Sequence, residues 1–209
     1  MEGIAEQPQK PKGFARELFS FVWEVLRMVA LSLIIILPVR YFVVQPFFVK
    51  GSSMIPNFHN QEYILVDRWT YHFGRPERGD VIVFRYPGNP KEFYIKRILG
   101  LPGESIIVGN NSIVVFNDRF PDGFSVAEQA YLPATNPTYC GNNTTFCGRK
   151  VEIKEDEYYV MGDNREHSSD SRAFGPVHKS FIAGLAWLRL WPLDEISSVP
   201  RVMYPPILR

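Results

Sequence analysis

Residues 78–104 read RGDVIVFRYPGNPKEFYIKRILGLPGE, and within them two apolar runs flank a turn. The runs cover residues 81–84 and 93–99, and the Pro-Gly-Asn-Pro sequence at 87–90 lies between them. β-Branched and aromatic residues favour strands, whereas prolines and glycines mark the turns that join them. The pattern predicts two short strands separated by a turn.

The same alternation of apolar runs and turn residues is found throughout the chain after about residue 45. No ten-residue amphipathic helix stands out, and the apolar run at 181–193 is broken by Arg189 and Pro192, which favours a buried strand over a membrane span. We therefore expect a mainly β domain over residues 46–209. Further strands are expected at residues 63–66, 113–116, 158–161 and 185–190.

A second apolar region, residues 14–49, precedes this domain, and its uninterrupted heart is MVALSLIIILPV at 28–39. It could be a cleavable signal peptide, a buried core helix or an uncleaved membrane anchor. No small-x-small cleavage site follows the heart, and residues 29–39 contain Ser32 but no polar stripe. Residues 19–39 provide the roughly 20 residues that a bilayer span requires. We predict a tail at 1–17, an anchor at 18–45 and the β domain at 46–209.

Positive residues near the predicted span set its expected orientation. Lys10, Lys12 and Arg16 precede the span, and Arg40 and Lys50 follow it, so the bias is slight. Because positive residues stay on the cytoplasmic side, we expect a cytoplasmic N-terminus and an extracytoplasmic β domain.

Composition excludes several classes of function. The formal net charge is +1, and the chain has no basic stripe of the kind that binds nucleic acid. Its histidines and cysteines do not form a metal-ligand pattern, so we expect no metal. Cys140 and Cys147 lie seven positions apart, and either a loop-closing disulfide or two free thiols fits this spacing.

Three segments carry groups capable of chemistry, although each has an ordinary structural explanation when taken alone. VKGSSMIP at 49–56 contains a turn serine, Ser53, and FYIKRILGLPGE at 93–104 contains a strand lysine, Lys96. MGDNREHSSDSR at 161–172 is dense in charged and hydroxyl groups. Its acidic and basic residues alternate along the segment and could form a lattice of ion pairs. Lysine loses its proton readily when buried, whereas arginine does not, which makes Lys96 the better base.

Taken together and in this order, the segments resemble the bacterial type I signal peptidases, as do RGDVIVF at 78–84 and AWLRLWP at 186–192. The resemblance covers residues 20–193. It implies a largely antiparallel β domain with a membrane-associated face, in a single-pass protein of the bacterial plasma membrane. It also implies that Ser53 is the nucleophile, Lys96 the general base and Ser168 the group that orients the lysine amine. Structural support is expected from Asp163, Arg165, Asp170 and Arg172.

The resemblance also indicates the substrate, namely exported precursors whose signal peptides are cut at small-x-small sites. No cofactor is expected, and the partners are precursor signal peptides and the lipid bilayer, with the protein itself a monomer. The substrate would add as an extended strand. The expected walls of its site are Phe47, Val49, Gly51, Ser52, Met54, Tyr94 and Ile95.

One departure from the family pattern concerns the oxyanion hole. Some members carry a hydroxyl two residues before the nucleophile, but Gly51 occupies that position here. The hole must then depend on backbone N–H groups, of which that of Ser53 is the first candidate.

The sequence disfavours three alternatives to this function. A triad based on His167 is disfavoured because His167 falls at a variable position of the motif. A self-cleaving repressor would need a DNA-binding helical module where this chain has an apolar segment. A non-catalytic membrane-tethered β domain would not be expected to keep Ser53, Lys96 and Ser168 together.

Overall fold

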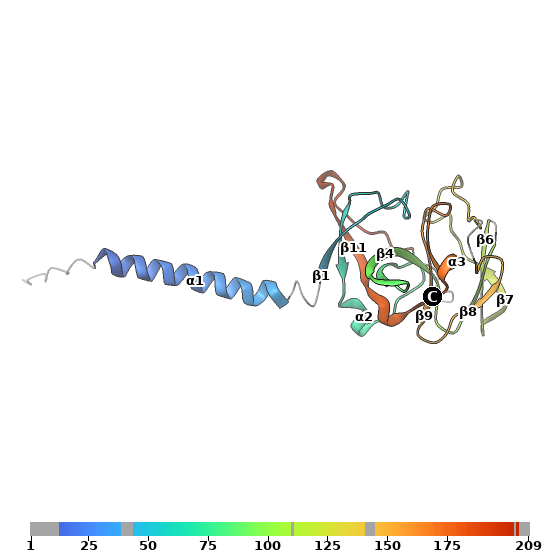
Figure 1. The fold of residues 1–209 in the computed structure, drawn as a ribbon, viewed down its shortest axis with the longest axis horizontal. Helices are drawn as coiled ribbons and strands as arrows, with labels where there is room; N and C mark the ends of the chain where they lie inside the picture. Colours follow the sequence, from blue (N-terminus) through green and yellow to red (C-terminus); the bar gives the residue numbers. More distant parts are fainter. Residues whose placement is uncertain (1–12, 39–43, 110, 141–144, 203, 205–209) are drawn as a thin grey trace, which may run out of the picture. The chain divides into compact units, whose positions relative to one another are not determined.

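The computed structural model describes residues 13–38, 44–109, 111–140, 145–202 and 204, and the chain forms two compact units. The first unit, Met1–Phe42, contains helix α1 (Phe14–Pro38), and the second, Val43–Arg209, contains the strands found in the described residues (Figure 1).

Helix α1 is long and apolar. Its segment Arg16–Pro38 has a mean hydropathy of 2.1, and none of it is buried. By length and composition, α1 can cross a bilayer. The helix begins at Phe14, and the first strand begins at Val44, inside the range predicted for the anchor.

The larger sheet of the second unit has eight strands, and every pairing in it is antiparallel. Its order is β1-β2-β11-β3-β4-β9-β10, with β12 added beside β11. The mainly β, antiparallel fold predicted from the sequence is therefore confirmed. The strands are β1 (Val44–Phe48), β2 (Tyr63–Asp67), β3 (Val81–Tyr86), β4 (Asn89–Gly100), β9 (Glu157–Met161), β10 (Val177–His178), β11 (Ile182–Trp191) and β12 (Ser197–Ser198).

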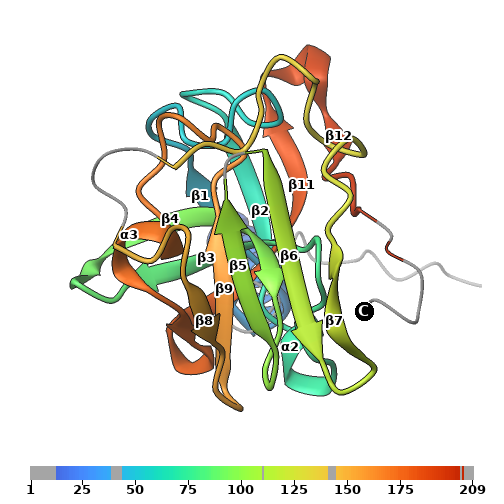
Figure 2. The same ribbon diagram turned by 90° about the vertical axis from the view of Figure 1, so that its right-hand side faces the viewer.

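A second, four-stranded sheet has the order β7-β6-β5-β8 (Figure 2). Its buried side chains, such as Ile106 and Val115, share one core with Leu99 of β4 and with Tyr159 and Met161 of β9. This shared core ties the second sheet to the strands that carry the candidate site. The strands are β5 (Ser105–Gly109), β6 (Ser112–Asn117), β7 (Phe120–Ser125) and β8 (Lys150–Glu152).

Short helices connect the strands. The α-helices are α2 (Thr70–Phe73) and α3 (Ser171–Phe174), and the 3-10 turns are Lys179–Phe181 and Leu193–Glu195.

The two strands expected in residues 78–104 form the central hairpin β3–β4. Val83 lies opposite Ile95, and Ile82 lies opposite Lys96. The run at 181–193 is mostly β11, which lies between β2 and β3; Gly184, Leu185 and Ala186 are buried, whereas Trp187 and Trp191 are exposed. Strand β7 was not anticipated, because its Pro121 and Gly123 are typical of turns. Its strand conformation depends on pairing with β6, which the local sequence does not report.

Cys140 and Cys147 form a disulfide, so the two-thiol alternative does not hold in this structure. The cysteine loop contacts the 161–172 segment beside it: Phe146 N donates to the Arg172 carbonyl at 2.9 Å, and Arg172 Nη1 donates to the Tyr139 carbonyl. These two hydrogen bonds join the segments on either side of the disulfide to Arg172, the last charged residue of the third segment.

Candidate active site

Ser53 lies on a tight turn that follows β1. Gly51 has a φ of 92°, a conformation that glycine adopts without strain, and its N–H donates to Asn60 Oδ1 at 2.9 Å. Ile55 N closes the turn by donating to the Ser52 carbonyl at 3.2 Å. The turn leaves Ser53 partly exposed, so a substrate can reach its hydroxyl.

Lys96 reaches Ser53 from strand β4. Its amine, Nζ, donates to Ser53 Oγ at 2.7 Å and to the Ile95 carbonyl at 2.8 Å, and the residue is only 3% exposed. The neighbouring Arg97 points to the opposite face of the strand, as alternation requires, but is buried as well. The strand thus buries two consecutive cations, and only the lysine contacts the serine.

Burial changes the acid–base properties of Lys96. Removing the ammonium from water lowers the pKa of Lys96 to about 8, and the negative charges of Asp170 and Asp163 oppose this effect only in part. A lysine with this pKa has a substantial neutral fraction near pH 7.5. It can therefore accept a proton from the hydroxyl that it contacts.

Asp163 connects the opposite face of β4 to the turn that carries Ser53. Its Oδ1 accepts from Arg97 Nε at 2.9 Å, and its Oδ2 accepts both from Arg97 Nη2 at 2.7 Å and from Asn57 Nδ2 at 2.8 Å. All atoms of Asp163 are buried. Removing one member of such a pair would leave an uncompensated buried charge, which would strongly destabilise the fold.

Asp170 and Arg172 form the second pair of the loop. Arg172 Nε donates to Asp170 Oδ1 at 2.9 Å, and Arg172 Nη2 donates to Oδ2 at 2.8 Å. Burial alone would raise the pKa of Asp170, but the hydrogen bonds and charge of Arg172 hold it below its ordinary value. Asp170 also accepts from Gly162 N at 3.0 Å, so the charged pair fixes the backbone at the start of the loop.

The lattice expected within residues 161–172 is therefore only partly correct. Asp170 and Arg172 do pair with each other, but Asp163 pairs with Arg97 of β4 and Arg165 pairs with Glu128. The reason is spatial: the loop is packed against the sheet, so its buried charges meet partners far along the chain. Adjacent charges in a sequence do not reveal such partners.

The lysine-orienting role expected of Ser168 stays a prediction, and its hydroxyl is buried close to the site. In the described part of the chain its hydroxyl makes no hydrogen bond to Lys96, whose amine instead donates to the Ile95 carbonyl. Ser168 is nevertheless close to the site, because a side chain added at Gly162 would meet both Ser168 and the Ser53 carbonyl. The Ile95 carbonyl belongs to the peptide next to Lys96, and this local partner could not be inferred from motif order.

A groove of about 560 Å³ opens beside Ser53 and Lys96. β1 and β4 supply its two walls, whose Phe47 and Phe93 rings lie 5.1 Å apart between centroids. Lys50, Glu92 and His167 add charged or titratable groups to its lining. Six of the seven residues predicted to contact substrate line this groove, namely Phe47, Val49, Gly51, Ser52, Tyr94 and Ile95.

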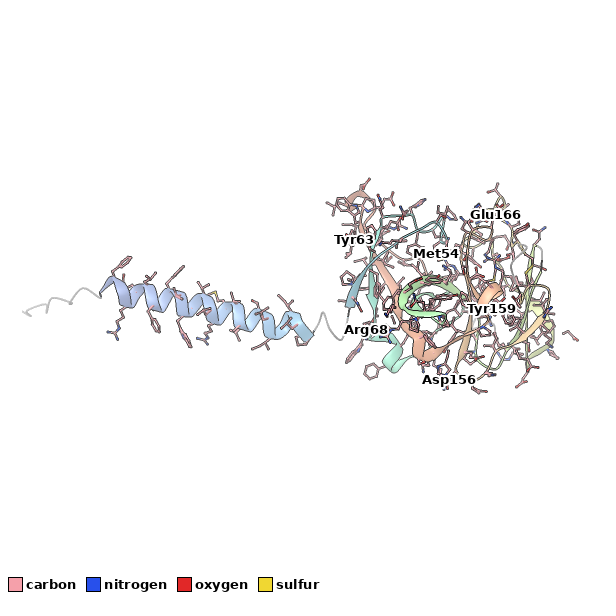
Figure 3. The ribbon with its side chains drawn as sticks, viewed as in Figure 1. Met54, Tyr63, Arg68, Asp156, Tyr159 and Glu166 are labelled. Carbon is pink, nitrogen blue, oxygen red and sulfur yellow. A yellow bond between two sulfur atoms is a disulfide. The ribbon has the colours of Figure 1, made fainter. Side chains whose placement is uncertain are left out.

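Met54 is the exception among the predicted substrate contacts. It is 1% exposed and packs behind the turn with Phe58, Ile64 and Ala186, within the side chains of the β domain drawn in Figure 3. Its sulfur accepts from Asp163 N at 3.5 Å. Met54 thus supports the turn from below and does not line the groove.

Neither histidines nor metal ligands complete the site in the described residues. His167 lines the groove but is not hydrogen-bonded to Ser53, and His59 pairs with Glu62 instead. Over the same residues, no group of His, Cys, Asp and Glu side chains could hold a metal ion.

Sequence reasoning missed two kinds of residue at this site. Arg97 was considered only as the alternative to Lys96, yet it is the partner of Asp163. Asn164, inside the third segment, was given no role, although its side chain donates to the Ser52 carbonyl at 3.0 Å. The sequence signal that could have identified Asn164 is its position directly after Asp163.

Comparison with known proteins places the chain in a family. The family described as "Signal peptidase, peptidase S26" matches residues 22–191. A Bacillus subtilis subsp. natto protein named signal peptidase I P is 32% identical over 82% of this chain and 90% of its own length.

Two further relatives extend this match. A Leptolyngbya laminosa signal peptidase I is 28% identical over 92% of this chain and 91% of its own length. A signal peptidase IB of Staphylococcus aureus (strain COL) is 31% identical over 84% of this chain and 93% of its own length. The segments that carry Ser53, Lys96 and the paired charges all lie within the matched residues, and this chain belongs to the signal peptidase family, peptidase S26.

Proposed function

We propose that this protein is a membrane-anchored serine endopeptidase that removes signal peptides from exported precursor proteins, with Ser53 as nucleophile and Lys96 as general base. The observation that carries the proposal is the 2.7 Å hydrogen bond between Lys96 Nζ and Ser53 Oγ, made by a buried lysine whose pKa is lowered to about 8. A serine hydroxyl is a weak nucleophile until a neighbouring base accepts its proton.

The reaction follows from this contact. Neutral Lys96 takes the proton of the Ser53 hydroxyl as Oγ attacks the scissile carbonyl, and the resulting ammonium then protonates the departing amine. The acyl group remains on Ser53 until water, activated by the same lysine, releases it. Asp163 and Asp170 stabilise the ammonium that forms during each half of the cycle, because both raise the pKa of Lys96.

The groove supports an extended peptide as substrate. Within the larger sheet, β1 is an edge strand whose ladder partner is β2, so one side of its backbone is available to a further strand. The aromatic rings of Phe47 and Phe93 lie close together in the lining of the groove and narrow it, which favours small side chains in the substrate. The site thereby fits the small-x-small sequences of secretory precursors.

We also propose that the N-terminus is cytoplasmic and that residues 46–209 form the catalytic domain on the opposite side of the plasma membrane. Support comes from the length and apolarity of α1, from the positive residues before it and from the disulfide, which persists outside reducing compartments. In membrane vesicles of known orientation, added protease should digest the β domain only when the extracytoplasmic face is accessible.

Cleavage of a purified precursor by the full chain in detergent tests the activity. We expect a single cut, located by mass spectrometry, directly after an Ala-x-Ala site. A matched precursor with Phe at both small positions should be cut at least about a hundredfold more slowly, because a misplaced peptide loses alignment with the serine. Ser53→Ala, prepared in the same way, controls for contaminating peptidases. Equal cleavage of both precursors by the wild type would contradict the proposed specificity.

A further inference from the structure

Asn164 joins the charged loop to the turn that carries Ser53. Its backbone N–H donates to the Ser53 carbonyl at 3.0 Å, and its side-chain Nδ2 donates to the Ser52 carbonyl at 3.0 Å. Its side-chain oxygen accepts from His167 N at 3.2 Å, and because that partner is a donor, the amide can adopt only this orientation. The side chain is therefore a fixed donor directed at one peptide group.

That peptide group contains the Ser53 N–H. The Ser52–Ser53 peptide is trans and planar, so its C=O and N–H point in opposite directions. Asn164 Nδ2 and Ile55 N both hold the carbonyl end. Within the described residues, the Ser53 N–H has no hydrogen-bond acceptor, so it remains available beside the nucleophile.

A free and fixed N–H at this position matters because the neighbouring residue offers no side-chain donor. Gly51 carries no hydroxyl, and an acyl-transfer site needs donors directed at the oxygen that becomes negative in the transition state. A peptide group held at one end only by the turn could rotate and move its N–H away from that oxygen. A second bond to the carbonyl, from a side chain anchored in another segment, restricts this rotation.

We propose that Asn164 is a positioning residue that orients the Ser52–Ser53 peptide so that the Ser53 N–H points into the oxyanion hole. The inference rests on the proposed function of Ser53. The Asn164 side chain, which lies outside the catalytic pair, would thereby compensate for the hydroxyl donor that Gly51 lacks.

Two substitutions at this position separate donation from simple loop support. Asn164→Ala removes both side-chain bonds. Asn164→Asp has nearly the same shape and can still accept from His167 N, but its carboxylate cannot donate to the Ser52 carbonyl at neutral pH. We expect both variants to lower kcat by about tenfold to a hundredfold with little change in KM, since loss of an oxyanion donor acts on the transition state. If Asn164 only supported the loop, Asn164→Asp would restore the wild-type kcat, and the inference would be wrong.

Asn136→Ala is the matched control. Asn136 Nδ2 donates to the Asp163 carbonyl at 2.8 Å, so this variant loses an amide bond to the same loop without touching the Ser52–Ser53 peptide. Melting temperatures of all variants in detergent show how much stability each loses. We expect Asn136→Ala to retain most of the wild-type kcat even where its melting temperature falls as far as that of Asn164→Ala. An equal loss of kcat in the two variants at equal stability would overturn the inference.

The affinities of two peptide inhibitors that end in Ala test the oxyanion hole directly. One inhibitor is an aldehyde, and the other is the corresponding alcohol. Ser53 Oγ adds to the aldehyde carbon, the carbonyl π bond becomes the alkoxide, and the hydroxyl proton passes to Lys96. The alcohol forms no such adduct. Asn164→Asp should bind the aldehyde at least about tenfold more weakly and the alcohol as the wild type does; unchanged aldehyde binding would overturn the inference. Activity in Ser53→Ala would instead refute the proposed function.

Discussion

Replacing Lys96 with methionine is expected to abolish precursor cleavage and, at the same time, to make the protein more stable. Loss of the base leaves the Ser53 hydroxyl without a proton acceptor, and we expect kcat to fall by at least about a thousandfold. Methionine fills a similar volume without an ionisable group. Single-turnover cleavage of a precursor in detergent measures the loss of activity.

The gain in stability follows from the lowered pKa. At pH 7 the folded protein bears the cost of a buried lysine whose pKa is about 8 instead of 10.5, which corresponds to about 3 kcal/mol. The sign is set by proton binding: between pH 8 and 10.5 the unfolded chain holds a proton on this lysine that the folded chain does not, so stability rises with pH in that window and the full cost applies below it. Lys96→Met removes the cost, and we expect the free energy of unfolding at pH 7 to increase by about 1–3 kcal/mol.

The control for this prediction is Lys154→Met, which alters an exposed lysine in the turn before β9. It should leave cleavage unchanged and shift the free energy of unfolding by less than about 0.5 kcal/mol. Urea unfolding of the three proteins provides the comparison. A Lys96→Met protein that is active, or that is less stable than the wild type by several kcal/mol, would contradict the role assigned to this lysine.

Gly162→Ala is expected to inactivate the enzyme although glycine itself has no chemical role. An added Cβ would meet the Ser168 hydroxyl, the Ser168 Cβ and the Ser53 carbonyl oxygen well inside van der Waals contact. The backbone of the nucleophile turn is one of the obstacles, so relief requires Ser53 to move. A displacement of about 1 Å at a reacting group can reduce the rate about a hundredfold, and overpacking costs about 1–3 kcal/mol of stability.

Gly109→Ala is a suitable comparison for Gly162→Ala. Gly109 ends β5, and an added Cβ there would approach only the Ser112 hydroxyl, at 3.3 Å, which a rotation of that side chain relieves. We expect Gly109→Ala to keep its activity within about threefold of the wild type. Wild-type rates in Gly162→Ala would mean that the turn tolerates a shift, and the structural account of its rigidity would then be incorrect.

The sequence was most informative where the chain alternates apolar runs with turn residues. The hairpin β3–β4 and the strand β11 follow from this pattern, because side-chain burial at the sheet depends on local periodicity. Strand β6 follows from it as well, at residues 113–116, but strand β7 does not, since Pro121 and Gly123 oppose a strand locally and only pairing with β6 overrides them. Pairing between distant segments leaves no trace in a short window of sequence.

The same distinction applies to the site. Motif order predicted that Ser53 and Lys96 belong together, and the structure places them in contact. It could not predict that Asp163 pairs with Arg97, that Arg165 pairs with Glu128 or that Met54 is buried, because each depends on how the loop packs against the sheet. Nor could it predict the bonds of Asn164, which depend on the direction of one peptide group.

The dependence of kcat/KM on pH, measured on a peptide containing an Ala-x-Ala site in detergent between pH 5 and 10, tests the Ser53–Lys96 pair most directly. Only the neutral lysine can accept the serine proton, so activity should rise about tenfold per pH unit at low pH and level off above a pKa of about 8. A profile that levels off near pH 6.5, as a histidine base would produce, or one that is flat across this range, would contradict the account.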